Sequence, residues 1–211
     1  MDLDRFCALR THQYHLTARS NLERILEQRL LVPAATTLTH GGHPIDQRRR
    51  ESIVVRTPVG EVHVRDQGPL HEGNMRLGDG WDLARFVAWV NRHVFFWPGN
   101  DEKPIAHGLR HFQRYEAESP VVLRVPTRAL LDANPDLAPR FARHNSGAPR
   151  WSGGKASPRG ARTYLPASQI DVTPGRVVEM VFEGAVRLPE GSGVEVLRGP
   201  WANGEGSVIR R

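Results

Sequence analysis

Apolar and polar positions along the chain follow two different spacings, which predict a mixture of strands and helices. Short extended runs occur at residues 14–17, 53–55, 62–64, 94–97, 121–125, 176–184 and 194–197. Apolar residues recur at helical spacing within residues 20–30, 82–90 and 104–115. The 211 residues are enough to bury a core, so we expect one domain spanning residues 1–211.

The first strand and helix place a histidine on a rigid support. His15 lies within the extended run at residues 14–17, and the helix follows at once. Ser20 and Glu23 have the spacing of a capping box, and Leu22, Ile25 and Leu26 form an apolar stripe behind it. Such an arrangement suits an imidazole at the floor of a cleft, although a lone histidine in a strand is also typical of a core or surface position.

A dense aromatic strand follows the helix that begins after Asp82. Neighbouring side chains of a strand point to opposite faces, so Phe96 must face opposite to Phe95 and Trp97. One face belongs to the core. The other face is either buried beneath a helix or offers a flat ring to a planar ligand.

The segments between these elements are predicted mainly as loops. Residues 34–44, 66–79 and 133–168 read as irregular, residues 45–50 as a short helix, and the runs at 53–55 and 62–64 as a hairpin. Thr127 is expected to cap a short helix at residues 128–131. His107 and His111 lie four apart on the helix at 104–115 and are expected to be exposed.

One acidic residue stands out in the strand at 176–184. Alternation puts Val178, Met180 and Phe182 on one face, and Glu179 between Val177 and Val181 on the other. A carboxylate among apolar neighbours is costly unless water, a cation or a ligand satisfies it. Glu179 is therefore the best candidate for a catalytic carboxylate, whereas Glu183 at the strand end has an ordinary solvated explanation.

The charge composition admits two explanations. The formal net charge is +6, and only Lys103 and Lys155 of the 29 basic residues are lysines. GC-rich codon usage produces such an arginine excess without selection, and clustered cations also bind phosphate backbones. The clusters are residues 48–50 and 150–162, either of which is a solvated charge run or an anion-binding segment.

Several classes of protein are disfavoured. No apolar run is long enough to cross a bilayer, and the first five residues are acidic where a secretory signal is basic, so we expect a cytoplasmic protein without membrane contact. The single Cys7 excludes an intramolecular disulfide and a cysteine cluster. The pairs His40/His43 and His107/His111 lack a third ligand nearby, so no metal site is expected.

Taken together, the motifs resemble those of ADP-ribosyltransferases, and most closely the DarT-type enzymes that modify DNA bases. Those enzymes carry, in this order, YHIT followed by NL and IL, then VPFYF.P, then AEVLV.G.V. This chain has YHLT at 14–17, NL at 21–22, IL at 25–26, VFFWP at 94–98 and VEMVFEG at 178–184. It departs after the aromatic strand, where PGND at 98–101 replaces PRSPM. The resemblance implies an α+β fold with the split central β-sheets of ADP-ribosyltransferases, flanked by helices.

The same resemblance implies roles for individual residues. It puts His15, Thr17 and Asn21 in a pocket for NAD, which is a substrate, with Phe96 or a neighbour against the nicotinamide, and makes Glu179 the catalytic carboxylate. It implies an assisting arginine, for which Arg49 and Arg50 fit best by their distance from His15 along the chain. The acceptor would be gripped by residues in the loop before Glu179, namely Arg159, Arg162 and Tyr164.

The implied function is transfer of ADP-ribose from NAD to a nucleic acid, most simply a base of single-stranded DNA or RNA. Reaching a base atom requires an unpaired nucleotide, on which Tyr164 would stack. Such a protein would be a toxin or phage-defence factor, with a cognate antitoxin or an ADP-ribosyl hydrolase as its partner. Two alternatives stay open: a protein or small-molecule acceptor, and a non-catalytic nucleic-acid-binding module with the same fold.

Overall fold

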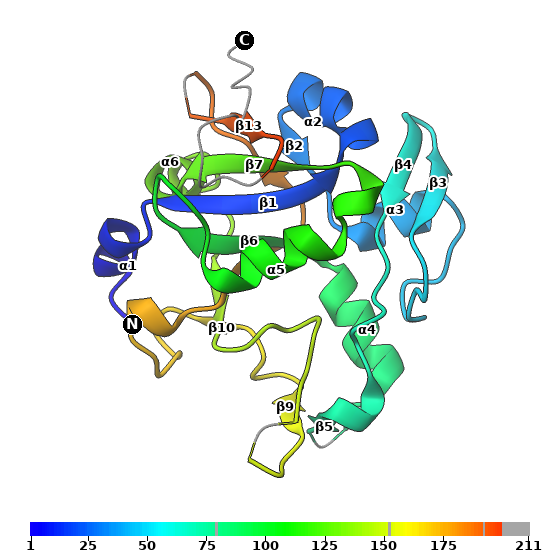
Figure 1. The fold of residues 1–211 in the computed structure, drawn as a ribbon, viewed down its shortest axis with the longest axis vertical. Coiled ribbons are helices and arrows are strands. Elements are labelled where there is room, and N and C mark those ends of the chain that lie inside the picture. Colours follow the sequence, from blue (N-terminus) through cyan, green and yellow to red (C-terminus); the bar gives the residue numbers. More distant parts are fainter. Residues whose placement is uncertain (79, 152, 192, 200–211) are drawn as a thin grey trace.

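The computed structural model describes residues 1–78, 80–151, 153–191 and 193–199, and its centre is an antiparallel sheet (Figure 1). Among these residues the sheet has seven strands, in the order β10 (Leu165–Pro166), β8 (Arg140–Ala142), β11 (Glu179–Glu183), β6 (His93–Gly99), β1 (His12–Ala18), β7 (Pro120–Pro126) and β13 (Glu195–Leu197). Smaller pairs are β2 (Leu30–Leu31) with β12 (Val186–Arg187), β3 (Ile53–Thr57) with β4 (Gly60–Val64), and β5 (Met75–Leu77) with β9 (Ser157–Arg159). With the helices, this confirms the α+β class.

The central sheet loosens between β1 and β6. β1 pairs with β7 along its whole length, but with β6 only through residues 12–14 opposite residues 97–99. Beyond that point β6 continues as a partner of β11, through residues 93–96. The first residue of β1 past the shared ladder is His15, whose Nδ1 lies 2.9 Å from the carbonyl oxygen of Phe95. The imidazole therefore bridges the two strands where their backbone pairing has ended.

One face of the sheet carries the largest apolar core. Phe96, Met180 and Phe182 point into it from the central strands and are fully buried. The helices that contribute to this core are α1 (Leu3–Leu9), α2 (Leu22–Gln28) and α6 (Thr127–Asp132). Burial of rings on this scale stabilises the fold through the hydrophobic effect and fixes which face each strand residue takes.

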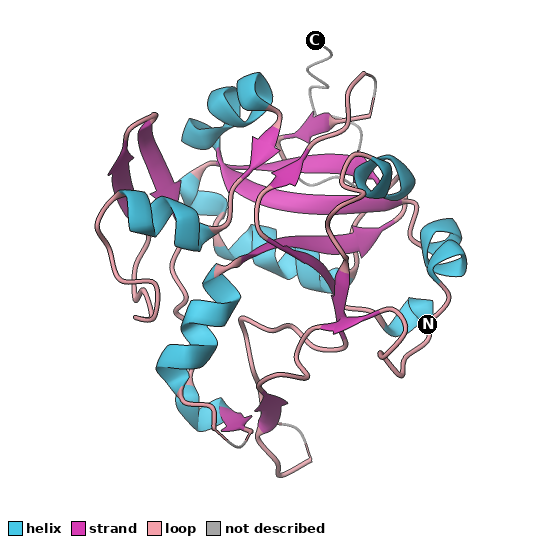
Figure 2. Ribbon diagram, turned by 180° about the vertical axis from the view of Figure 1, so that it is seen from behind, coloured by secondary structure: helices cyan, strands magenta, loops and turns pink. Residues whose placement is uncertain are grey.

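The opposite face carries α4 (Leu83–Asn91) and α5 (Ala106–Arg114). Trp89 of α4 packs against Phe95 and Tyr164, and Phe112 of α5 packs with Tyr14 and Trp97. The helix α3 (Ala34–His40) covers the β3–β4 hairpin through Leu38. Viewed from behind, β5 and β9 lie beyond the start of α4, away from the main sheet (Figure 2).

Single turns of 3-10 helix complete the described secondary structure. They are η1 (Arg19–Asn21), η2 (Glu72–Asn74), η3 (Glu116–Glu118) and η4 (Pro174–Arg176). Nowhere in the described ranges does a helix have the length and apolar character that crossing a membrane requires.

The strands and the main helices form where the periodicity predicts them. The hairpin is confirmed, and Asp82 caps α4 by accepting a 2.7 Å hydrogen bond from the N–H of Arg85. The long segment at 133–168 is largely irregular, and its described residues form only the short strands β8, β9 and β10.

Three local predictions are wrong, each for a physical reason. Residues 34–40 form α3 although threonine is a weak helix former, because Leu38 packs on the hairpin. Residues 45–50 form no helix, since the backbone of Arg49 exchanges bonds with Gln67 instead. Ser20 makes no capping bond: it lies in η1, and α2 begins at Leu22.

The predicted cap of the last short helix is also wrong. Thr127 is the first residue of α6, and its hydroxyl donates to the carbonyl oxygen of Arg10 while accepting a 3.0 Å bond from the side chain of Gln13. Both bonds are buried or partly buried. Thr127 therefore ties α6 to the chain around β1 and does not satisfy the start of its own helix.

Candidate functional site

A cavity of about 290 Å³ opens where β1 and β6 part. Its polar lining includes His15, Thr17, Asn21, Arg49, Arg65, His111, Ser146 and Glu179. A second group of lining residues is apolar and comes from α2, β4 and the segment from β2 to the start of α3: Ile25, Leu31, Val32, Pro33, Ala34 and Val62. The volume is near the lower end of small-molecule sites, which span roughly 300–1,000 Å³.

Glu179 is the buried carboxylate of the cavity. It is the first residue of β11, is 2% exposed, and accepts bonds from the backbone N–H of Ser146 at 3.2 Å to each oxygen. Burial raises its pKa to about 7, against the opposing effects of Ser146 and of the Arg159 charge. At neutral pH the group is thus a mixture of acid and carboxylate, as a site that handles charge or protons requires.

His15 presents a defined tautomer to the cavity. Burial lowers its pKa to about 4, so the ring is neutral at pH 7. Since the carbonyl oxygen of Phe95 can only accept, Nδ1 must carry the proton of their 2.9 Å bond. Nε2 is then left as an acceptor, suited to a hydroxyl group of a ligand.

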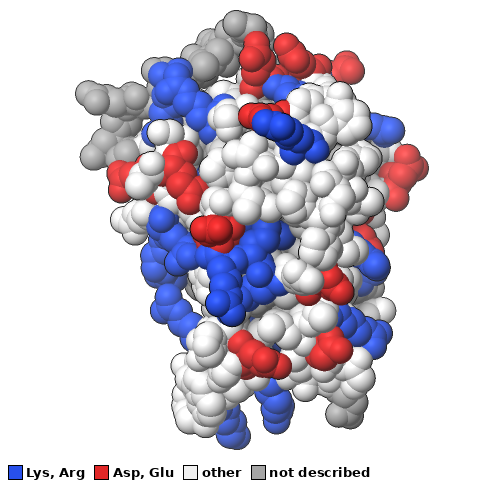
Figure 3. Space-filling view, turned by 90° about the vertical axis from the view of Figure 1, so that its right-hand side faces the viewer, with Lys and Arg blue, Asp and Glu red and all other residues white. Residues whose placement is uncertain are grey.

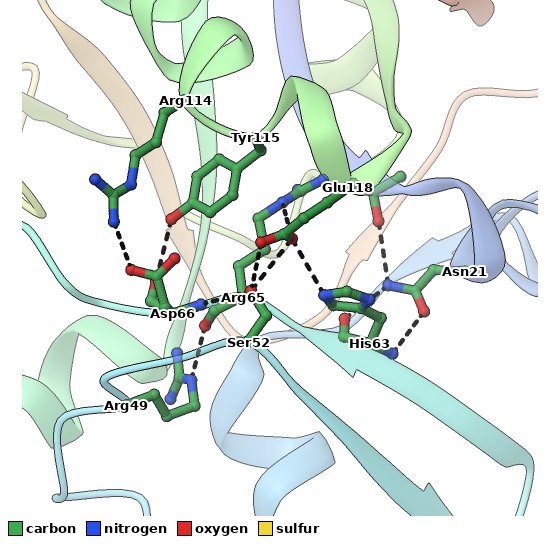
Figure 4. A network of polar contacts seen from close by, with 10 residues as sticks. Asn21, Arg49, Ser52, His63, Arg65, Asp66, Arg114, Tyr115 and Glu118 are labelled. Atoms are coloured by element: carbon green, nitrogen blue, oxygen red, sulfur yellow. Dashed lines mark hydrogen bonds and ion pairs between the residues drawn. The ribbon is translucent and has the colours of Figure 1, made fainter.

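Asn21 and Thr17 line the same cavity, but the amide of Asn21 is used within the protein. It donates to the carbonyl oxygen of His63 and accepts from the N–H of His63, each at 2.9 Å, and its second N–H points to the hydroxyl of Thr17 at 3.4 Å (Figure 4). This exchange mimics a strand ladder. Asn21 therefore positions the β3–β4 hairpin against β1, and the cofactor contact predicted for it would have to come from its remaining surface.

Of the two candidate arginines, one lines the cavity and the other lies outside it. Arg49 lines the cavity, where its Nε donates to the carbonyl oxygen of Arg65 at 2.9 Å and its Nη1 to Asn91 at 3.1 Å. Burial lowers its pKa to about 10, which still leaves it charged at pH 7. Arg50 is exposed and borders a shallow hollow with Arg48 and His71, so the prediction that it belongs to the site is wrong.

Of the residues predicted to face the nicotinamide, Phe96 or a neighbour, the choice of Phe96 itself is wrong. Phe96 is fully buried in the core on the opposite face, against Phe182. Its neighbours Phe95 and Trp97 line the cavity instead. The predicted alternation along the strand is confirmed, with Phe96 on the core face and its two neighbours on the cavity face.

Two of the three predicted acceptor-binding residues are buried. Arg159 is 4% exposed and donates to the carbonyl oxygens of Asn145, Ser146 and Pro158 and to the hydroxyl of Ser157. Tyr164 is 0% exposed, so no base can stack on it. Arg162 is exposed, as a contact with an acceptor requires.

Arg159 and Tyr164 instead form the support behind Glu179. The hydrogen bonds of Arg159 fix the backbone at residues 145–146, and that backbone supplies the N–H that Glu179 accepts. Tyr164 packs with Trp89 and Phe95 on the same side of the sheet. The loop that carries Arg159 and Tyr164 thus orients the carboxylate from within the protein.

Residues that the sequence did not indicate complete the site. His111 was expected to be exposed, yet it lines the cavity, contacts the rings of Trp97 and Tyr115, and has a pKa of about 3, lowered chiefly by burial. A signal was present in Gly108: a Cβ there would lie 3.1 Å from Trp97, so this side of α5 must face β6. Arg65, at the end of β4, has no comparable signal.

Charged groups also gather on one face of the molecule. Figure 3 views the side of the molecule that carries α4 and the β3–β4 hairpin, and shows basic side chains around an acidic group. Asp66 binds Arg114 at 2.9 Å and the N–H of Gly68 at 2.6 Å. Within the described residues, no group of three or more His, Cys, Asp or Glu side chains is arranged to hold a metal ion.

Comparison with known proteins gives a family match. A protein-family model described as "Family of unknown function (DUF7002)" matches residues 11–190. The matched range includes β1, the hairpin and β11, and therefore the main walls of the cavity. No curated protein matches the chain.

Proposed function

The chain belongs to this family of unknown function, and from its cavity we propose that it is an NAD-dependent ADP-ribosyltransferase. One observation carries the proposal. Glu179, His15 and Arg49 come from three distant stretches of the chain and line one cavity. The parting of β1 from β6 supports the further proposal that the sheet is of the split ADP-ribosyltransferase type.

The residues suit the chemistry of this reaction. Breaking the bond between nicotinamide and ribose builds positive charge on the ribose, as in glycoside cleavage. A fixed carboxylate stabilises that charge best where water is excluded, which matches the 2% exposure of Glu179. The free Nε2 of His15 would accept a hydrogen bond from a ribose hydroxyl and so hold the ring in place.

The two ends of NAD would contact different parts of the lining. The apolar group that includes Ile25, Leu31 and Val62 would receive the adenine, and the half-buried ring of Phe95 would face the nicotinamide. Arg49 would interact with the anionic part between them, since a guanidinium matches phosphate oxygens.

For the acceptor we propose a nucleic acid first. The net charge of +6 and the exposed Arg150, Lys155 and Arg162 support it, since these cations lie in the segment that precedes β11 and Glu179. A protein or small-molecule acceptor is the second candidate, favoured by the burial of Tyr164 and Arg159. With a nucleic-acid acceptor, the protein would be a toxin or defence factor that needs an antitoxin or hydrolase.

Incubation with NAD labelled in the adenylate part tests the proposal. Purified protein is mixed with single-stranded DNA, RNA or cell protein, and nicotinamide release and acceptor labelling are measured. We expect release of nicotinamide and label on single-stranded nucleic acid. Label on protein would select the second candidate, whereas NAD that is neither bound nor cleaved in any mixture would contradict the enzyme and leave a nucleic-acid-binding module.

The neighbouring arginines provide a matched pair of variants. Arg49→Lys keeps the charge but loses the planar fork, so we expect the KM for NAD to rise about tenfold. Arg50→Lys removes the same fork from an exposed position and is expected to change the KM by less than about twofold. Steady-state nicotinamide release checks both, and an equal effect of the two substitutions would refute the assignment of Arg49.

A further inference from the structure

Arg65 is a buried cation without a hydrogen bond at two of its nitrogens. Its side chain is 13% exposed and lines the cavity just past the end of β4. Nε and Nη2 are both buried, and neither has a hydrogen-bond partner among the described residues. Buried guanidinium N–H groups are costly to leave unpaired, so a ligand that accepts from them would supply what the protein does not.

The nearest acid does not satisfy Arg65. Glu118 comes no closer than 3.9 Å to Nε of Arg65. Its carboxylate accepts bonds from the hydroxyl of Ser52 at 3.0 and 3.2 Å and lies 3.3 Å from Nε2 of His63 (Figure 4). Glu118 therefore offsets part of the Arg65 charge from a distance and leaves its donors open.

Of the other neighbours of Arg65, Asp66 leaves its N–H groups at Nε and Nη2 unpaired, and Tyr115 holds its guanidinium in position. Asp66 follows Arg65 in the chain, but its carboxylate is bound to Arg114 and to the N–H of Gly68. The guanidinium of Arg65 lies over the ring of Tyr115, 4.9 Å from its centre. A stacked guanidinium keeps its N–H edge free for acceptors in the plane of the fork.

Two neutral imidazoles of the cavity, those of His15 and His111, lie in the same lining as Arg65. The rings of His111 and Tyr115 are 5.1 Å apart, and Arg65 stacks on the same Tyr115 ring, so His111 and Arg65 lie close together. Burial chiefly lowers the pKa values of His15 and His111, and the charge of Arg65 lowers both further. Arg49 adds a second charge and binds the backbone of Arg65. Neutral imidazoles beside two guanidinium groups form an environment suited to a phosphate anion.

We propose that Arg65 anchors the pyrophosphate of the dinucleotide through its free N–H edge, with the ring of His111 alongside. The proposal rests on the proposed function for the identity of the dinucleotide, but the binding of phosphate oxygens at Arg65 stands on the geometry alone. It assigns the pyrophosphate to the part of the cavity between β4 and α5, and leaves Glu179 and His15 for the ribose whose bond is broken.

Calorimetric titration of three probes tests this assignment: inorganic pyrophosphate, ADP-ribose and adenosine. Arg65→Met removes the donors at similar length, and we expect about a tenfold or greater loss of affinity for ADP-ribose and for pyrophosphate, with adenosine unchanged. Arg56→Met is the matched control, because Arg56 lies on the same hairpin with its side chain 90% exposed and is expected to bind all three as the wild type does.

Arg65→Lys guards against a folding defect, since it keeps a charge at the site and is expected to bind ADP-ribose with intermediate affinity. The inference is overturned if Arg65→Met binds ADP-ribose as tightly as the wild type, if adenosine binding falls in parallel, or if the wild type binds neither pyrophosphate nor ADP-ribose. Nicotinamide release by the wild type is measured separately. Pyrophosphate binding that depends on Arg65, without NAD cleavage, would uphold this subsite and reject the proposed function.

Discussion

Replacing Glu179 with glutamine is expected to lower kcat for nicotinamide release about 1000-fold or more. The substitution keeps the shape of the side chain and removes the negative charge that would stabilise the developing ribose cation. A loss of this size corresponds to roughly 4 kcal/mol of transition-state stabilisation, which is typical for a single preorganised electrostatic group. The measurement is single-turnover cleavage of NAD at pH 8, where the wild-type carboxylate is mostly ionised.

Glu183 supplies the control for this substitution. It ends the same strand as Glu179 but is exposed, so Glu183→Gln removes an equal charge away from the cavity. We expect it to keep the wild-type rate. Equal activity of Glu179→Gln and the wild type would remove the catalytic assignment altogether.

The second large effect concerns stability. The Glu179 carboxylate proposed to assist catalysis is expected to destabilise the fold. Burial raises the pKa of Glu179 to about 7 in the folded protein, above its ordinary value of 4.5. The folded state then binds the proton more tightly than the unfolded state, so this group destabilises the fold progressively as pH rises from about 4.5 to 7. The accumulated cost is roughly 3 kcal/mol, because each pKa unit corresponds to about 1.4 kcal/mol.

Glu179→Gln does not titrate, which isolates this contribution. Its free energy of unfolding relative to the wild type should increase by roughly 3 kcal/mol between pH 4 and pH 8, as measured by urea unfolding at each pH. His15, whose pKa is lowered to about 4, adds stability as pH rises through about 4 to 6.5, but does so in both proteins and cancels in the difference. A difference that does not change with pH would mean that Glu179 is not buried as an acid.

The sequence predicted those parts of the site in which a local pattern conflicts with its surroundings. Glu179 interrupts an apolar strand face and His15 interrupts a short strand, and both line the cavity. The alternation predicted that Phe95 and Phe96 point to opposite faces, but nothing in the local sequence indicates which face of β6 meets the core. That choice depends on Phe182 and Met180, which are more than 80 residues away in the chain.

The wrong predictions concern residues whose burial depends on contacts between irregular segments. Arg159 and Tyr164 lie in a stretch rich in glycine, serine and arginine that is typical of an exposed segment. Arg159 is buried because its guanidinium binds the backbone at residues 145–146, an interaction between two irregular segments with no periodic signature. Arg65 was missed for a similar reason, since its cavity position follows from the docking of the hairpin by Asn21.

The structure alters the residues proposed for the acceptor more than the residues proposed for NAD. The residues proposed for NAD remain together in the cavity, with Phe95 in place of Phe96 and Arg49 preferred over Arg50. The residues proposed to grip a base are reduced to the exposed cations, of which Arg162 was predicted. Acceptor selection is therefore expected to depend on charge more than on stacking, and nucleic-acid labelling should fall steeply with added salt.

Calorimetric titration of NAD into Glu179→Gln tests the central claim most directly, because this variant should bind the dinucleotide without cleaving it. We predict binding of one NAD per chain, with an affinity that falls about tenfold when His15→Phe is added and the acceptor at Nε2 is lost. No detectable binding of NAD at millimolar concentration, or equal affinity with and without the His15 substitution, would contradict the proposed site.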